Sequence, residues 1–244
     1  MKNIQLIISY RGTHYCGWQI QPNGISIQEL ITRGITELTG EYVNLTASGR
    51  TDARVHALKQ CANFLTSSTI PPNQFFQALN TKLPPDIRIL SSKECARNFH
   101  SRYDAKGKSY LYKIYESNVA SPFESDLAFH ISKSLDWQAM KEAAEYFMGE
   151  HDFRAFMASG SSVKNTVRTI ESISFEKKED IWEITFKGSG FLYNMVRIMV
   201  GTLYEVGFHR IAPMEVSGII QGLDRSKAGV TAPAHGLYLK EVFY

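Results

Sequence analysis

The chain is poor in cysteine: its 244 residues include only Cys16, Cys61 and Cys95. These three are widely spaced, and neither a CxxC pair nor an HExxH motif occurs. The spacing typical of a structural zinc site or of a disulfide framework is therefore missing. His14 and Cys16 come nearest to a ligand pair and do not have zinc-site spacing. We expect a reducing, cytoplasmic setting and no metal ion.

Long apolar runs are also missing. The most apolar stretch, residues 191–203, is interrupted by Asn194, Arg197 and Gly201, whereas a membrane span needs about 18 apolar residues. The first ten residues are followed directly by polar ones, unlike a signal peptide. No GxxxxGK[ST], GxGxxG or GxSxG motif is present, so a nucleotide cofactor and a serine-hydrolase elbow have no support. We expect no membrane association and no cofactor.

Positive charge is concentrated in the first part of the chain. Residues 1–113 carry 14 Lys and Arg against 7 Asp and Glu, whereas residues 114–244 carry 13 against 17. The densest basic stretch, residues 88–113, alternates cations with aromatic side chains. Cationic side chains bind phosphates and aromatic rings stack on bases, so this combination is typical of an RNA-binding surface. A solvated strand with snorkelling lysines is the alternative. The cations are Arg88, Lys93, Arg97, Arg102, Lys106, Lys108 and Lys113, and the aromatic residues are Phe99, His100, Tyr103, Tyr110 and Tyr112.

Predicted strands occur in neighbouring pairs separated by helices. This order differs from strict βαβα alternation and favours an α+β fold with a mainly antiparallel sheet. Period-2 alternation and turn residues predict the strands, and helical periodicity with capping residues predicts the helices. The predicted strands are 3–10, 42–47, 55–66, 86–91, 107–116, 167–177, 181–188 and 236–244, and the predicted helices are 26–38, a helix opened by Pro71 and Pro72, 136–148, 191–206 and 213–222.

A polar turn between two predicted strands carries the strongest local signal, SGRTDARVHA at residues 48–57. Asp52 is the only carboxylate between Glu41 and Asp86, and Arg50 and Arg54 flank it. A carboxylate beside arginines stays ionised, which suits a nucleophile or an electrostatic stabiliser better than a general acid. The alternative is structural: Asp52 makes an Asx turn and Arg50 a surface ion pair.

Tyr110 and Arg197 are the other candidates. Tyr110 lies on the basic, aromatic strand, where its ring can stack on a base and its hydroxyl can take part in proton transfer; a core tyrosine is the alternative. Arg197 interrupts an apolar helix, so it needs a partner, and Asp52 is one candidate. The other candidate partner is a structural Asp or Glu, with Arg197 at a polar edge of the helix. Gly201, one turn on, is expected to leave space above that helix face.

Seven segments taken together resemble the TruA family of tRNA pseudouridine synthases. The resemblance covers nearly the whole chain, and the order of the segments makes it specific. They are SYRGTHYCGWQIQP (9–22), SGRTDARVHA (48–57), NTKLPPDIRI (80–89), FHSRYDAKGKSYLYKI (99–114), HDFRAF (151–156), GSGFLYNMVRIMVG (188–201) and APAHGLYLKEVFY (232–244).

This resemblance implies an enzyme that isomerises uridine to pseudouridine at positions 38, 39 and 40 of the tRNA anticodon stem-loop, without a cofactor. Asp52 matches the family's catalytic aspartate, Tyr110 the tyrosine that stacks on the target base, Arg197 the arginine that pairs with the aspartate, and Arg50 the arginine associated with base flipping. Arg54, Lys106 and Lys108 are expected to contact RNA. The resemblance also implies a homodimer whose protomers share one tRNA.

The resemblance further implies a central antiparallel sheet of two similar halves. We divide the chain into residues 1–104, which carry the aspartate loop, and residues 105–244, together forming one catalytic unit. Arg54 departs from the family pattern, which usually has glycine there; such a glycine often serves a positive φ. Arg54 in place of glycine is expected to alter either the set of tRNA positions that the enzyme modifies or the geometry of the loop. The alternative function is a non-catalytic tRNA-binding or tRNA-folding protein of the same fold.

Overall fold

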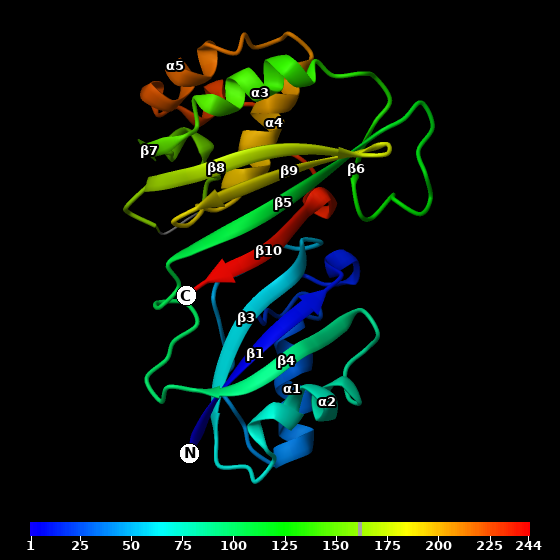
Figure 1. Cartoon of the computed structure of the whole chain (residues 1–244), viewed down its shortest axis with the longest axis vertical. Coiled ribbons are helices and arrows are strands. Elements are labelled where there is room, and N and C mark those ends of the chain that lie inside the picture. The colour runs from blue at the N-terminus through cyan, green and yellow to red at the C-terminus, as the bar shows by residue number, and fades with distance from the viewer. Residues whose placement is uncertain (161–162) are drawn as a thin grey trace. The chain divides into compact units, whose positions relative to one another are not determined.

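The computed structural model describes residues 1–160 and 163–244, which form two compact units (Figure 1). Unit 1 comprises Met1–Lys106 together with Tyr238–Tyr244, and unit 2 comprises Gly107–Leu237. The halves expected from the sequence, 1–104 and 105–244, assign the C-terminal segment to the second half. In the structure this segment belongs with unit 1 because its strand pairs with a strand of that unit.

Unit 1 consists of a sheet and two helices that pack beside it (Figure 1). Its strands run in the order β4-β1-β3-β10, with β2 paired to β3. β1 is antiparallel to β4 and β3, whereas β10 is parallel to β3. The elements are β1 (Lys2–Tyr10), η1 (Gly12–His14), α1 (Ile27–Thr39), β2 (Thr46–Ala47), β3 (His56–Thr66), η2 (Pro72–Gln74), α2 (Phe75–Asn80), β4 (Ile87–Cys95) and β10 (Leu237–Phe243).

Alternation of side chains along β1 builds the core of unit 1. Ile4, Leu6 and Ile8 point to one face of the sheet and are fully buried, as the period of 2 requires. Helix α1 adds three isoleucines at helical spacing. Its start is capped by Ser26, whose Oγ accepts from the Glu29 amide at 3.2 Å, so the predicted start of this helix is confirmed.

Unit 2 consists of an antiparallel sheet with helices packed beside it (Figure 1). Its strands run in the order β5-β9-β8-β7, and β6 pairs in parallel with β5. The elements are β5 (Gly107–Glu116), β6 (Phe129–Ile131), α3 (Trp137–Glu145), β7 (Gly149–Asp152), η3 (Arg154–Phe156), β8 (Val167–Lys178), β9 (Ile181–Gly188), α4 (Met195–Gly207), α5 (Glu215–Gly222), η4 (Arg225–Lys227) and η5 (Ala234–Gly236).

The core of unit 2 lies between its sheet and helix α4. Tyr112 of β5 lies opposite Ile184 of β9, and both are fully buried. Helix α4 is apolar almost all round, which is typical of a helix packed on several sides. Asp136 caps α3 by accepting from the Ala139 amide at 2.9 Å, as the sequence predicts.

The fold class predicted from the sequence is confirmed: α+β, with a mainly antiparallel arrangement of strands and flanking helices. Several predicted elements differ in extent, among them the strand predicted at 86–91, which continues to Cys95, and the helix predicted at 136–148, which ends at Glu145. The strand expected at 42–47 shrinks to Thr46–Ala47, and the helix expected from residue 191 begins only at Met195. The late start follows from Asn194, whose φ of 59° is left-handed and cannot continue a right-handed helix.

Within the described residues, no helix is long and apolar enough to cross a membrane.

Candidate active site

The loop between β2 and β3, residues 48–55, presents three of the predicted site residues. Asp52 is half-buried, whereas Arg50 and Arg54 are exposed. The amide of Val55 donates to the Asp52 carbonyl at 3.1 Å and closes a tight turn. The carboxylate of Asp52, with Arg50 and Arg54 near it in the sequence, is thus at a position that solvent can reach.

The loop is held by the segment that follows β1, residues 10–18. The Tyr10 and Thr51 hydroxyls lie 2.7 Å apart and share a hydrogen bond. The amide of Trp18 donates to the Thr51 carbonyl at 3.0 Å, and the amide of Arg54 donates to the Tyr15 carbonyl at 3.3 Å. Main-chain and side-chain contacts thus fix the residues on both sides of Asp52.

His56 anchors the far end of the loop. Its Nδ1 accepts from the Gly12 amide at 3.0 Å, so the ring proton of a neutral His56 lies on Nε2. The ring is buried and stacks on Tyr238 at a centroid distance of 4.6 Å. Strand β10 therefore contributes directly to the support of the loop.

Two glycines permit this close packing. A Cβ at Gly12 would collide with the Val55 carbonyl oxygen, and a Cβ at Gly17 would lie 2.5 Å from the Thr51 carbonyl oxygen. Gly17 also has a φ of +104°. The positions of both glycines thus follow from the approach of one backbone segment to another.

The near end of the loop is held by a buried glutamine. Ser48 Oγ donates to Gln60 Oε1 at 2.7 Å, and Gln60 Nε2 donates to the Gly49 carbonyl at 3.0 Å. Burial raises the pKa of Tyr10, which keeps that hydroxyl protonated and able to hydrogen bond. The loop that carries Asp52 is thus held at both ends.

Unit 2 positions Tyr110. This residue lies on β5 opposite Phe186 of β9, and its ring meets Phe191 edge-on at 5.1 Å. The ring is half-buried. Lys108 lies on the same strand, whereas Lys106, which is exposed, is the last residue of the first part of unit 1.

Arg197 lies in the first turn of α4. Its Nε donates to the Ala232 carbonyl at 2.7 Å, and its Nη1 donates to Asn194 Oδ1 at 2.8 Å. Nearby, the buried Tyr112 hydroxyl donates to the Pro233 carbonyl at 2.8 Å. Burial raises the pKa of Tyr112, and the positive charge of Arg197 offsets a part of that rise.

The space expected above Gly201 is filled. A Cβ at Gly201 would collide with the Val230 carbonyl oxygen, because residues 228–232 cross α4 at this point. The amide of Ala232 donates to the Arg197 carbonyl at 3.1 Å. Gly201 therefore serves the packing that holds Arg197 and does not open a cavity.

The structure brings Arg50, Asp52 and Arg54 together on one loop of unit 1 and Tyr110 and Arg197 onto neighbouring elements of unit 2. The sequence analysis missed the support formed by residues 10–18 and assigned His56 no role. The signal available was the pair of glycines at 12 and 17, in a segment that was interpreted only as a family motif.

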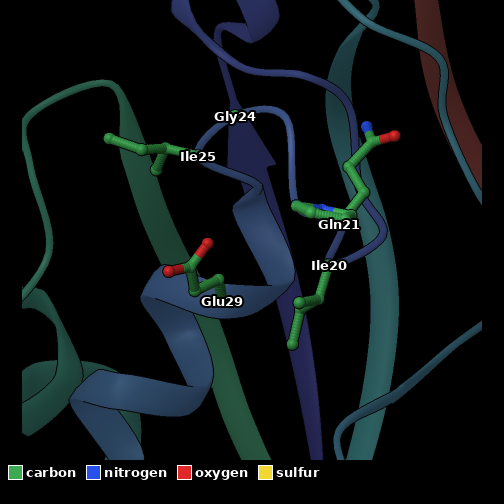
Figure 2. Close-up of a pocket in the computed structure, with 6 residues that line it drawn as sticks. Ile20, Gln21, Gly24, Ile25 and Glu29 are labelled. Carbon is green, nitrogen blue, oxygen red and sulfur yellow. The ribbon is translucent and has the colours of Figure 1, made fainter.

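Unit 1 also has an open depression of about 600 Å³ beside the start of α1. None of the predicted site residues lines it. The lining residues are Ile20, Gln21, Pro22, Gly24, Ile25 and Glu29 (Figure 2). Among the described residues, no group of three or more His, Cys, Asp or Glu side chains is arranged to hold a metal ion.

Comparisons with known proteins show the family of the chain. A family model described as tRNA pseudouridine synthase matches residues 6–104 and 143–244. The tRNA pseudouridine synthase A of Acetivibrio thermocellus is 52% identical over 244 residues, covering 100% of both chains. The tRNA pseudouridine synthase A 2 of Clostridium tetani is 51% identical over 245 residues, covering 100% of this chain and 99% of the relative.

Among solved structures, an archaeal box H/ACA sRNP Nop10-Cbf5 complex contains a chain that is similar at 10% identity and a TM-score of 0.41. The match covers 97% of this chain and 48% of that one. The family model and the full-length relatives are much stronger matches. The chain therefore belongs to the tRNA pseudouridine synthase family and is an isomerase of that class.

Proposed function

We propose that this isomerase forms pseudouridine at positions 38, 39 and 40 of the anticodon stem-loop of tRNAs, with Asp52 as the nucleophile. The observation that carries the proposal is the support of the Asp52 loop. On one side of Asp52, Thr51 shares a hydrogen bond with the Tyr10 hydroxyl and accepts one from the Trp18 amide. On the other side, the Arg54 amide donates to the Tyr15 carbonyl. A rigid loop that leaves one carboxylate half-buried meets the need of catalysis for a preorganised reactive group.

The reaction exchanges one glycosidic bond for another. The bond from uracil N1 to C1′ breaks, the ring turns, and C5 bonds to C1′; N1 gains a proton and C5 loses one. Asp52 can attack the sugar or the base, or remove the C2′ proton to give a glycal. Each route needs an ionised carboxylate, and the flanking cations Arg50 and Arg54 favour that form.

The remaining residues have distinct proposed roles. Tyr110 stacks on the target base and assists removal of the C5 proton, because a half-buried aromatic ring that carries a hydroxyl suits both tasks. Arg197 pairs with Asp52; its hydrogen bonds to Ala232 and Asn194 fix its direction. Arg50 helps to hold the target nucleotide out of its stack, a step that costs a few kcal/mol.

Contacts to the RNA backbone offset that cost. We assign them to Arg54, Lys106 and Lys108, in the basic part of the chain. The proposed enzyme works without a cofactor in the cytoplasm, as a homodimer whose protomers contact the anticodon arm of one tRNA.

Release of tritium from [5-³H]uridine-labelled tRNA tests the proposal, because C5 must lose its hydrogen when it becomes the glycosidic carbon. Asp52→Asn keeps the shape of the side chain and removes the charge. We expect the rate of release to fall about a thousandfold or more while tRNA binding is retained. Substituting uridines 38, 39 and 40 one at a time should identify the targets.

Glu94→Gln is the matched control, because it removes an exposed carboxylate of the same unit and should leave the rate unchanged. Arg197→Gln should lower the rate without abolishing tRNA binding. Tritium release by Asp52→Asn at the wild-type rate would contradict the role of Asp52. Binding of tRNA without release by the wild type would favour the non-catalytic tRNA-binding or tRNA-folding protein.

A further inference from the structure

An exposed tyrosine of unit 1, Tyr103, lies on the turn between β4 and β5, residues 99–104. The ring of Tyr103 is 75% exposed. The imidazole of His100 lies against it at a centroid distance of 4.2 Å and an angle of 31°, and the guanidinium carbon of Arg102 lies 5.8 Å from its centroid. His100 and Arg102 therefore contact the ring, although most of the surface of Tyr103 meets solvent.

Hydrogen bonds hold the backbone of this turn. His100 Nδ1 accepts from the amides of Arg102 and Tyr103 at 3.1 and 3.3 Å. The Asp104 carboxylate accepts from the His100 amide at 2.9 Å. The only acidic side chain in the turn is thus engaged with the backbone, and His100 both shapes the turn and supports the Tyr103 ring.

Buried contacts anchor the turn to the sheet. Asn63 Oδ1 of β3 accepts from the amide of Ser101 at 2.9 Å, and the C-terminal Tyr244 donates its hydroxyl to the Ser101 carbonyl at 2.7 Å. The ring of Phe99 packs on that of Tyr244 at 5.0 Å. An aromatic ring on so firmly held a turn loses little conformational freedom when a ligand stacks on it.

The surroundings of the ring are cationic. Arg97, Arg102 and Lys106 are all exposed on the same chain segment. A site for an apolar protein segment would have apolar neighbours, whereas cations around an open aromatic face suit an unpaired nucleobase and its adjoining phosphates.

We propose that Tyr103, supported by His100, is a stacking platform for an unpaired base of the tRNA substrate, separate from the loop that carries Asp52. The proposal rests on the proposed function, because that function supplies tRNA as the ligand. The platform adds affinity and orientation; it takes no part in bond breaking. Arg102 and Lys106 contact the phosphates on either side of the stacked base.

Affinity for tRNA, measured by filter binding with Tyr103→Ala and Tyr103→Phe, tests the platform. Loss of one base stack weakens binding about tenfold, so we expect that change for the alanine variant and an unchanged affinity for the phenylalanine variant. Tyr42→Ala is the matched control, since Tyr42 is 87% exposed in the same unit, and it should bind as the wild type does.

Three further measurements separate base stacking from charge effects and from loss of folding. A blunt RNA duplex of equal charge has no unpaired base, so Tyr103→Ala should bind it as the wild type does. The slope of log Kd against log salt should stay the same for Tyr103→Ala and fall by about one for Arg102→Gln. The melting temperature of Tyr103→Ala should not change, because the side chain is exposed.

Equal affinities of Tyr103→Ala and Tyr42→Ala for tRNA would overturn the platform, even if the wild type releases tritium. An equal loss of affinity for tRNA and for the duplex would also overturn it. The proposed function fails separately, by the absence of tritium release from the wild type. A wild type that does not bind tRNA would overturn both.

Discussion

Arg54 has a backbone conformation that is unfavourable for a residue with a side chain. Its φ of 67° is left-handed, which costs a non-glycine residue about 1 kcal/mol. The hydrogen bond from its amide to the Tyr15 carbonyl holds it there. The resemblance implies a glycine at this position, whereas this chain has an exposed cation on the strained turn that follows Asp52.

Arg54→Gly should relieve that strain. We expect the free energy of unfolding to rise by about 0.5–1 kcal/mol, measured by urea denaturation. Arg54→Ala removes the same cation but keeps a Cβ at positive φ, so its stability should stay close to that of the wild type. A glycine variant no more stable than the alanine variant would show that the turn is not strained.

At the scale of elements, helix α4 depends on one close approach. Residues 228–232 cross it at Gly201, where there is no room for a Cβ. The crossing segment supplies the Ala232 carbonyl that accepts from Arg197 at 2.7 Å. Packing of this helix and the direction of the arginine side chain are therefore coupled.

Gly201→Ala should lower the free energy of unfolding by about 2–3 kcal/mol, because the added methyl group must displace the crossing segment. Gly218→Ala in α5 is the matched control. A Cβ there meets no atom within 4 Å, so the better helix propensity of alanine should stabilise the protein by up to about 1 kcal/mol. The two variants changing stability in the same direction would contradict this account; thermal denaturation measures both.

Strands β5, β8 and β9 share an ion cluster around Glu183. Its carboxylate lies 2.7 Å from the ammonium of Lys178 and 3.4 Å from that of Lys113. Partial burial raises the pKa of Glu183, but these two cations lower it by more, so that the net pKa lies below the ordinary value of 4.5.

A lowered carboxyl pKa means that the folded state favours the ionised form. The stabilisation is complete above the ordinary glutamate pKa and is lost as pH falls through the lowered one. Glu183→Gln should therefore cost about 1 kcal/mol at pH 7 and make stability less dependent on pH below 4.5. Urea denaturation between pH 7 and 3 measures this. Glu171→Gln, which breaks the more exposed pair with Lys187, should have the smaller effect; the reverse order would count against the cluster.

At the scale of the whole molecule, the unequal distribution of charge matters more than the net charge of +3. The excess of cations lies in residues 1–113, and the excess of carboxylates lies in residues 114–244. An anionic RNA should therefore interact most strongly with the first of these regions, and salt should weaken that interaction.

Lys106→Gln should reduce the slope of log Kd against log salt for tRNA by about one, since one phosphate contact is lost. Lys133→Gln changes the charge by the same amount in the acidic part of the chain, on a side chain that is also exposed, and should leave the slope unchanged. Equal slopes for both variants would argue against a phosphate contact at Lys106.

Strong local patterns allowed several elements to be predicted. Clean alternation predicted the strand at 107–116, and a charged turn at 177–180 separated the strands predicted at 167–177 and 181–188. Ser26 and Asp136 predicted two helix starts because a capping side chain acts within three residues. The start of α4 was wrong because the left-handed Asn194 has no such signature.

The sequence by itself determined the fold class, the family and the candidate residues, because periodicity, capping and motif order are local properties of the chain. Only the tertiary structure decided what supports them. It showed that residues 10–18 and His56 hold the Asp52 loop and that the Val230 backbone occupies the space beside Gly201. It also showed that the C-terminal strand belongs with unit 1. These facts depend on contacts between segments far apart in the chain, and such contacts leave no periodic trace in the sequence.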